Sequence, residues 1–237
     1  MARGMAGQAR GLSALQLKRD GAELVHRLSP DKLAELEAFF ATVPAGAGHR
    51  LSEAARFASI VEPLHELVQG LIGPKARAVR AIAFDKTGDV EARRNWSLGW
   101  HQDRTICVQD HHEMPGYERW TRKHGITHVE PPFCVIETML TARFHLDRVD
   151  HSNAPLKIAA GSHQHGLIAE SEIDALVERS SIYACLAERS DVWLYATPIL
   201  HASEASLSSA SRRVLQVDFH GSDLPAPLAW LFDRPAA

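Results

Sequence analysis

Two His-x-Asp pairs in the sequence have the spacing of a metal chelate. His101 and Asp103 lie in the segment NWSLGWHQDRTICV, and His145 and Asp147 lie in TARFHLD. Residues i and i+2 of a β-strand project from the same face, so each pair could direct an imidazole and a carboxylate at one ion. With 14 histidines in the chain, roughly one such pair is expected by chance. The spacing alone therefore does not establish a metal site.

A further histidine and an arginine single out the first pair. His201 follows the strand-like segment DVWLYA, and Arg212 lies eleven residues later, at the head of the strand-like VLQVDF. Two histidines and one carboxylate leave metal positions open for a chelating cosubstrate and dioxygen, and arginine can grip a carboxylate by two parallel hydrogen bonds. We expect a hairpin to return the chain antiparallel and to bring His201 and Arg212 together. His111 and Arg122 share this spacing in a polar stretch without evident strands, and we discount them.

The first third of the chain is predicted to hold one strand and two helical segments. A short strand is expected over 22–28, followed by a helix over 29–43 with Ser29 as N-cap and Pro30 in the first turn. A second helical pattern over 52–72 is interrupted at Pro63.

The remaining chain reads as short β-prone runs with one clear helix, SEIDALVERS. The runs are ARAVRAIAF, RTICV, FCVIETMLTARFHL, LKIAA, DVWLYA and RRVLQVDF. Many short strands without long intervening helices predict an antiparallel sandwich or jelly roll. We therefore predict a single domain: a loose tail (1–15), an N-terminal strand and helices packed on the core (16–75), and the jelly-roll core (76–237).

Composition points to small-molecule partners. The 237 residues carry a net charge of −3, so no chain-wide positive field favours nucleic acid or an anionic membrane. No run of apolar residues is long enough to span a bilayer, and the N-terminus has no apolar signal region. Three scattered cysteines, Cys107, Cys134 and Cys185, argue against a disulfide framework and against a thiolate zinc site. A reducing, cytoplasmic environment is the prediction.

Several sequence blocks together resemble the phytanoyl-CoA dioxygenase family of Fe(II)- and 2-oxoglutarate-dependent oxygenases. They are GWHQD, APLKIAAGSHQHGLI, HAS with SRR about eleven positions on, and the opening LKRDGAELVHRLSPDKLAELEAFF. Their order and spacing make the resemblance specific, and it covers nearly the whole chain. The blocks depart from the family pattern in SNAPL, AGSH and SEASL, at positions that are not ligands.

The resemblance implies a mainly β fold with flanking helices, a double-stranded β-helix of the jelly-roll, cupin-like type. It implies that His101, Asp103 and His201 bind iron, that Arg212 binds the distal carboxylate of 2-oxoglutarate, and that Ser203 adds a hydrogen bond to it. The implied reaction hydroxylates a small organic substrate with O2 and yields succinate and CO2. Relatives that halogenate have lost the carboxylate at the position of Asp103, so its presence favours hydroxylation.

Other candidate side chains have competing interpretations. Trp96 and Trp100 could shape the pocket mouth or belong to the core. The polar face of TARFHLD, with Arg143 and His145, is more often the wet side of a half-buried strand, but in a barrel it would line the cavity and Arg143 could grip a substrate anion.

Two histidines, one arginine and one long loop segment also carry predictions. His163 and His165 have chelating spacing, but the neighbouring glycines indicate a loop. Arg213 should face away from Arg212 and be solvated. Segment 110–132 is expected to cover the pocket.

Two other functions remain open from sequence. One is a cupin-like metal enzyme that uses His101 and His201 without 2-oxoglutarate, and the other is a non-catalytic small-molecule-binding barrel. Loss of activity on replacing Arg212 would not be expected in the first, and no oxo acid would be consumed in the second. The substrate and the oligomeric state are not readable from the sequence.

Overall fold

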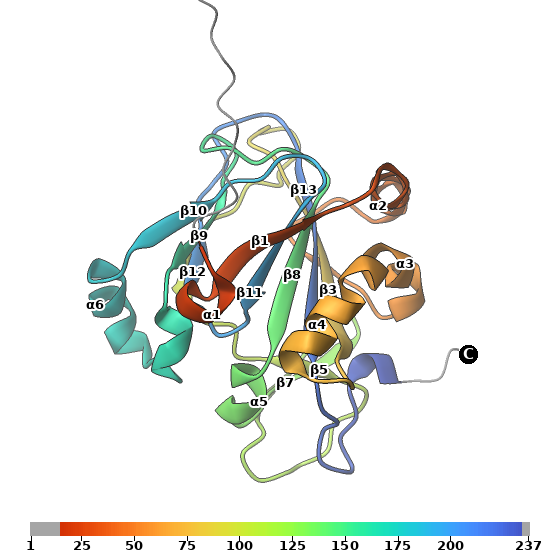
Figure 1. Cartoon of the computed structure of the whole chain (residues 1–237), viewed down its shortest axis with the longest axis vertical. Coiled ribbons are helices and arrows are strands. Elements are labelled where there is room, and N and C mark those ends of the chain that lie inside the picture. The colour runs from red at the N-terminus through yellow and green to blue at the C-terminus, as the bar shows by residue number, and fades with distance from the viewer. Residues whose placement is uncertain (1–14, 234–237) are drawn as a thin grey trace, which may run out of the picture.

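Two antiparallel sheets form the core of the computed structural model, which describes residues 15–233 (Figure 1). The larger sheet has the order β1 (Ala22–Arg27), β11 (Asp191–Ala196), β8 (Leu140–His145), β13 (Arg212–His220), β3 (Arg77–Lys86) and β2 (His49–Arg50). The smaller sheet has the order β10 (Ile182–Cys185), β9 (Leu156–Ala159), β12 (His201–Ser203) and β4 (Leu98–His101). The predicted jelly roll with flanking helices is confirmed.

Helices from the N-terminal third cover one face of the larger sheet (Figure 1). They are α1 (Leu17–Asp20), α2 (Pro30–Thr42), α3 (Ala58–Val61) and α4 (His65–Ile72), with 3₁₀ turns at Ala54–Arg56 and Glu62–Leu64. The Ser29 hydroxyl accepts a hydrogen bond from the Lys32 amide and so caps α2, as predicted. Leu36 and Phe39 of α2 pack with Phe144 and Leu215 of the sheet, and each such buried side chain stabilises the fold by about 1.5–3 kcal/mol.

The segment between β5 and β8 departs from expectation. β5 (Ile106–Val108), which the run RTICV predicted, forms a third, small antiparallel sheet with β7 (Ile126–Glu130) and β6 (Glu118–Lys123). β6 lies in the polar stretch in which no strand was evident from the sequence. The run FCVIETMLTARFHL was predicted as β-prone throughout, but its first part is helix α5 (Phe133–Glu137). The preceding prolines explain this, because proline has no amide hydrogen for a strand ladder and is tolerated where a helix begins.

The remaining short elements lie in the second half of the chain. Helix α6 (Ile173–Glu178) is shorter than the segment SEIDALVERS from which it was predicted. Short 3₁₀ turns occupy Ser162–His165, Glu170–Glu172 and Leu231–Asp233. The predicted loose tail lies, apart from Leu15, outside the described residues, and the division into one domain stays a prediction.

The larger sheet is buried on both faces. On β8, Ala142 and Phe144 face the helices, while Thr141, Arg143 and His145 alternate to the face toward the smaller sheet, and all of these are buried. The expectation that this polar face is the wet side of a half-buried strand is therefore wrong, because the smaller sheet covers it. The interior between the two sheets is consequently lined by polar and charged side chains.

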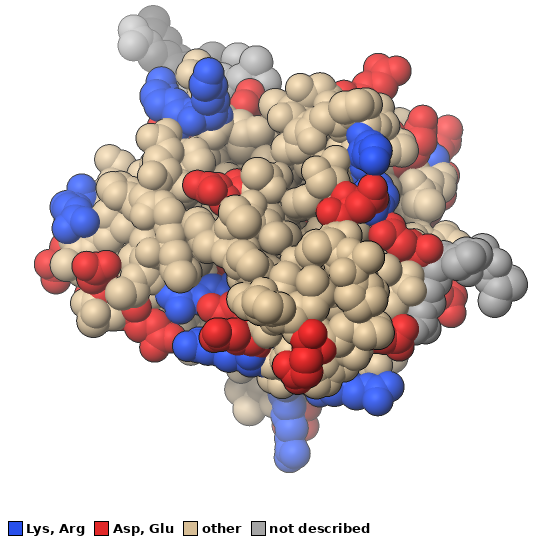
Figure 2. All heavy atoms as spheres, turned by 90° about the horizontal axis from the view of Figure 1, so that it is seen from below, with Lys and Arg blue, Asp and Glu red and all other residues tan. Residues whose placement is uncertain are grey.

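The outer surface shows no dominant charge on the face seen in Figure 2, where basic and acidic side chains are interspersed. Within residues 15–233, every helix is too short or too polar to cross a bilayer.

Candidate metal centre and its pocket

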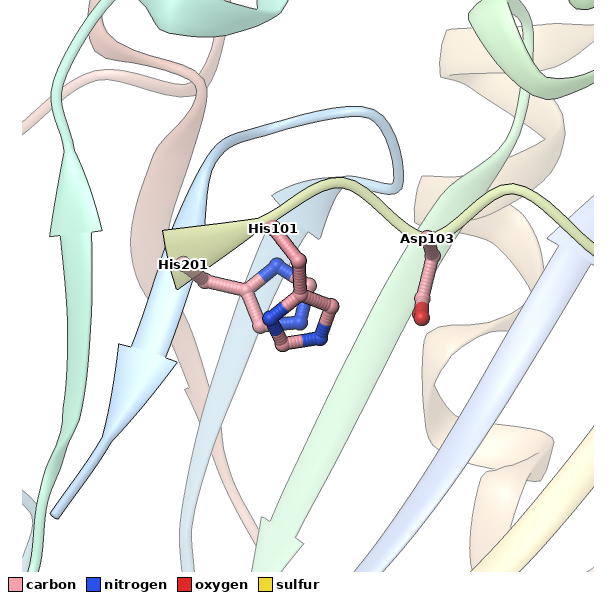
Figure 3. Close-up of side chains that lie close together, drawn as sticks. All are labelled: His101, Asp103 and His201. Atoms are coloured by element: carbon pink, nitrogen blue, oxygen red, sulfur yellow. The ribbon is translucent and has the colours of Figure 1, made fainter. Parts of the chain in front are cut away.

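The three predicted ligands converge where the smaller sheet meets the interior. His101 ends β4, His201 begins β12, and the two are directly paired across these antiparallel strands. Asp103 lies two residues beyond His101 and projects to the same side (Figure 3). The imidazole centroids are 4.3 Å apart, and one potential ligand atom from each of the three residues lies within 4.8 Å of the others. Among the described residues, no other such group of metal-ligating side chains is found.

Backbone carbonyls fix the orientation of both imidazoles. His101 Nδ1 donates to the Gly99 carbonyl oxygen at 2.7 Å, and His201 Nδ1 donates to the Ile199 oxygen at 2.9 Å. Since a carbonyl oxygen can only accept, the proton resides on Nδ1 and the Nε2 lone pair is available to a metal. Burial, together with the neighbouring His101, lowers the pKa of His201 to about 4, which keeps this imidazole in the neutral, ligating form.

Gln102 locks the chain between the first two ligands. Its side-chain amide donates to the Gly166 oxygen at 3.0 Å and to the Pro198 oxygen at 2.8 Å, and its carbonyl accepts from the Ile168 amide at 2.9 Å. The side chain is buried and points away from the ligands, as strand alternation predicts. Because Pro198 lies three residues before His201, one side chain ties both ligand-bearing segments together.

Arg80 holds the carboxylate of Asp103. Its Nη2 donates to Asp103 Oδ2 at 2.8 Å, its Nη1 donates to the Thr105 oxygen at 3.1 Å, and its Nε donates to Asp218 on the paired strand β13. Burial raises the pKa of Asp103, but the charge of Arg80 and the two histidines outweigh burial, and the pKa falls to about 2. Asp103 is therefore ionised at neutral pH, and its Oδ1 accepts no hydrogen bond from any described residue.

Three buried cations face the same interior without a carboxylate partner in the described part of the chain. Arg212 donates from Nη1 to the Ala154 oxygen at 2.6 Å, and Arg143 donates from Nη1 to Gln216 at 3.4 Å, while the Nε atoms of both arginines have no partner. Lys86, which pairs with Arg212 across β3 and β13, donates to the Ser203 hydroxyl at 3.0 Å. Burial and the nearby Arg143 lower the pKa of Arg212 to about 9. The arrangement can accept an anion.

A pocket of about 350 Å³ joins the predicted ligands to Arg143 and Arg212. His101, Asp103, His201, Arg143 and Arg212 all line it. Its other walls are formed by Ala47, Gly48, Arg50, Arg80, Ile82, Phe84, Trp96, Leu98, Thr105, Lys123, Leu156, Ala202, Ser203 and Gln216. Its volume lies at the low end of the roughly 300–1,000 Å³ typical of small-molecule sites.

Sequence comparison agrees with this geometry. Residues 17–214 match the phytanoyl-CoA dioxygenase (PhyH) family. The chain belongs to this family. No curated protein sequence matches the chain significantly.

Three solved structures illustrate how far the fold is shared. EctD from S. alaskensis with bound Fe has a TM-score of 0.65 at 15% identity, over 93% of this chain and 79% of that chain. HygX from Streptomyces hygroscopicus with nickel and 2-oxoglutarate bound has a TM-score of 0.59 at 12% identity, over 87% and 85%. EvdMO1 has a TM-score of 0.61 at 17% identity over 86% of this chain, which spans only 48% of the EvdMO1 chain. At these identities the likeness shows the fold.

The hairpin predicted to join His201 and Arg212 does not form in this member of the family. β12 and β13 belong to different sheets, so the two residues face one another across the interior instead of along a ladder. Both nevertheless line one pocket. The two candidate tryptophans lie in different places. Trp96 lines the pocket, and the centre of its ring is 4.6 Å from Lys86 Nζ. Trp100 packs against Ile168, Ile173 and Leu200.

The second His-x-Asp pair does not form a chelate. Asp147 is ion-paired with Arg213 at 2.7 Å. Arg213 faces away from Arg212, as expected, but it is only partly solvated because it binds this carboxylate. His145 is buried among cations, and neither of its ring nitrogens has a partner in the described structure.

The other discounted histidines lie away from the pocket. His163 and His165 occupy a 3₁₀ turn, and His111 stacks on Trp120 at the surface. Arg122 donates to the Gly125 oxygen in the β6–β7 hairpin.

Sequence reasoning missed Arg80, Asp218 and Lys86. Each is a charged residue within a mainly apolar strand segment, ARAVRAIAFDK or VLQVDF. A charge in such a run is costly to bury unless it is paired or awaits a ligand. That signal could have identified all three as residues of the site.

Proposed function

We propose that the protein is an Fe(II)- and 2-oxoglutarate-dependent oxygenase that hydroxylates a small organic substrate. The observation that carries this proposal is the shared pocket, in which a His–Asp–His group and the carboxylate-free Arg212 face the same cavity. The balanced reaction consumes the substrate, O2 and 2-oxoglutarate, and yields the hydroxylated substrate, succinate and CO2.

The donor set suits iron(II). Two imidazole Nε2 atoms and one carboxylate oxygen form the 2-His-1-carboxylate set that leaves positions open on a non-haem ferrous ion. When bound, iron supplies the redox chemistry that couples oxidative decarboxylation of the oxo acid to hydroxylation. Within the protein, the carbonyls of Gly99 and Ile199 orient the imidazoles, and Arg80 orients Asp103. Retention of this carboxylate supports hydroxylation over halogenation.

The cations suit the distal carboxylate of 2-oxoglutarate. Arg212 is 3% exposed, and among the described residues its only hydrogen-bond partner is a neutral carbonyl, so an incoming carboxylate would compensate a buried charge. Lys86 and Ser203 lie beside it and offer further contacts. The aromatic and aliphatic walls from Phe84, Trp96 and Leu156 exclude water from the reacting groups.

Succinate formation without added substrate tests the proposal. The protein should release succinate from 2-oxoglutarate in an Fe(II)-dependent reaction. His201→Ala should abolish this reaction, and Arg212→Ala should lower its rate about 10- to 100-fold when 2-oxoglutarate is below saturation. Metal binding to the His–Asp–His group without any succinate formation would favour a cupin-like metal enzyme that does not use the oxo acid. Failure to bind or consume 2-oxoglutarate under any condition would favour a non-catalytic barrel. The outward-facing Arg213→Ala variant is the matched control.

The proposal also includes the compartment in which the protein works. Cys107, Cys134 and Cys185 are all free thiols, which supports the predicted reducing, cytoplasmic environment.

A further inference from the structure

The pocket holds more positive charge than the oxo acid requires. Five cationic side chains line it, and Asp103 is the only acidic one among the described lining residues. Arg80 is neutralised by Asp103 and Asp218, and Arg212, with Arg143 beside it, faces the expected distal carboxylate. The other carboxylate of 2-oxoglutarate would chelate the metal. Arg50 and Lys123 therefore remain unaccounted for.

Arg50 is held in place by a neutral histidine. It lies on the edge strand β2, where its Nε donates to His128 Nε2 at 3.2 Å. His128 Nδ1 in turn donates to the Ile126 oxygen at 3.0 Å, so the Nε2 atom is the acceptor. Burial lowers the pKa of His128 to about 4 and keeps the ring neutral. The guanidinium is thus oriented without being neutralised, and its two terminal nitrogens contact no acceptor in the described structure.

The β6–β7 hairpin places a second cation on the same wall. Its turn residues, His124 and Gly125, both have positive φ, 51° and 78°, as a tight two-residue hairpin turn requires. The turn extends over β2, where the rings of His124 and His49 stack at 5.9 Å. Lys123, immediately before the turn, lines the pocket together with Arg50. Part of the segment expected to cover the pocket therefore does so.

Arg50 is close to the reacting centre. Its pKa is lowered by burial and by the charge of Arg80, and Asp103 acts on it in the opposite direction. Arg50 and Asp103 line the same pocket. Arg50 pairs with Ile82 of the neighbouring strand β3, four residues along that strand from Lys86, which pairs with Arg212. A molecule bound between Arg50 and the metal ligands would occupy the position of the substrate to be hydroxylated.

We infer that the substrate is a small organic acid whose carboxylate or phosphate group is bound by Arg50, with Lys123 contributing. This inference rests on the proposed function of the same site. A fork of guanidinium donors matches an anionic oxygen group, and such charge-assisted bonds are about twice as strong as neutral ones. Because about 350 Å³ must also hold the oxo acid, the enclosed part of the substrate is small. Arg50 is thereby the specificity-determining residue.

Calorimetric titration of nickel-loaded protein saturated with 2-oxoglutarate tests this inference. Nickel replaces iron to prevent turnover, and the probes are hexanoate, hexyl phosphate and the uncharged hexanamide. We expect at least one of the two anions to bind about tenfold or more tightly than the amide. Comparison of the two anions distinguishes a carboxylate from a phosphate site. Equal affinity for the anions and the amide, or no measurable binding of either anion, would overturn the inference.

Variants assign the effect to its residue. Arg50→Gln should remove most of the preference for the anion and leave the affinities for hexanamide and 2-oxoglutarate unchanged. Lys123→Gln should reduce the preference less, and the surface variant Arg179→Gln should not change it. An Arg50→Gln protein that keeps its preference, or that weakens acid and amide equally, would contradict the assignment.

The same titrations separate this inference from the proposed function. If 2-oxoglutarate does not bind, the proposed function fails. In that case the role of Arg50 is still decided with nickel-loaded Arg212→Met protein. A preference for acid over amide that is lost on adding Arg50→Gln supports the role, and a preference that persists contradicts it.

Discussion

Arg80 and Arg212 are both buried in the larger sheet, yet their surroundings are opposite. Arg80 lies between two carboxylates, and although burial lowers its pKa, Asp218 and Asp103 raise it well above its ordinary value. Arg212 has only a carbonyl partner, and burial with the nearby Arg143 lowers its pKa to about 9. One arginine is satisfied by the fold and positions Asp103, the proposed metal ligand. The other is left unsatisfied by the fold, which indicates a binding residue.

Asp218→Asn tests the satisfied region and should have the largest effect on stability. Removing one carboxylate leaves Arg80 buried with a single anionic partner, and breaking a buried pair costs about 3–5 kcal/mol. Because Asp103 remains, we expect a loss near the lower value, about 3 kcal/mol, in the free energy of unfolding measured by urea denaturation. Glu37→Gln, which removes the exposed ion pair with Arg189, should change stability by about 0.5 kcal/mol or less. Similar losses of unfolding free energy in the two variants would show that the buried ion pairs of Arg80 contribute no more than an exposed pair.

Arg212→Met tests the unsatisfied region, and here stability and binding should separate. The variant removes a buried, uncompensated charge, so the free energy of unfolding should stay the same or rise. The affinity for 2-oxoglutarate should fall about 10- to 100-fold, as expected for loss of charge-assisted hydrogen bonds. Arg213→Met, on the opposite face of the same strand, should lose its ion pair with Asp147 without changing this affinity. A destabilised Arg212→Met protein with normal affinity would assign Arg212 to the fold.

Lys86 predicts a smaller, pH-dependent effect on stability. Burial, with Arg212 and Arg143 nearby, lowers its pKa from 10.5 to about 7. Between these two pH values the unfolded chain therefore binds a proton that the folded chain lacks, so stability rises with pH. The destabilisation caused by burying the charged amine is fully present below pH 7 and disappears toward pH 10.5.

The measurement is the difference between wild type and Lys86→Met. Relative to the variant, the wild type should gain about 1–2 kcal/mol of stability between pH 7 and pH 9. Saturating 2-oxoglutarate should shrink this gain, because the carboxylate favours the protonated amine. A difference that is flat with pH would show that Lys86 stays charged in the free protein.

The same contrast explains what could be predicted from the sequence. His101, Asp103 and His201 could be identified because ligand types at fixed spacing, and the family resemblance, do not depend on knowing the sheets. The jelly roll could be predicted for the same reason, because the alternation within each short β-prone run and the turn residues between the runs are local features of the sequence. The iron-binding role of the three residues stays a prediction.

Tertiary placement could not be predicted in the same way. Alternation along β8 separates two faces but does not say which one a second sheet will cover, so the polar face with Arg143 was interpreted first as the wet side, with a cavity lining as the alternative. Proximity of His201 and Arg212 was predicted for the wrong reason, because a local return of the chain does not determine which sheet each strand joins. Arg50 and Lys123 come from an edge strand and a distant hairpin, and only the folded chain brings them to the pocket.

Ser203→Ala should give the smallest effect and shows whether the two regions are coupled. The Ser203 hydroxyl accepts from Lys86 Nζ at 3.0 Å and donates to the Ala154 oxygen at 3.4 Å, the same oxygen that accepts from Arg212. Its loss should weaken 2-oxoglutarate binding about 2- to 10-fold, as for one neutral hydrogen bond.

The pH dependence of that affinity is the sharper measurement. Because the lost acceptor stabilised the charged amine, the pKa of Lys86 should fall further. The affinity for 2-oxoglutarate should therefore decline more steeply than in wild type between about pH 6.5 and pH 8.5. An unchanged pH profile with weaker binding would mean that Ser203 contacts the oxo acid directly. No change in either quantity would remove Ser203 from the site.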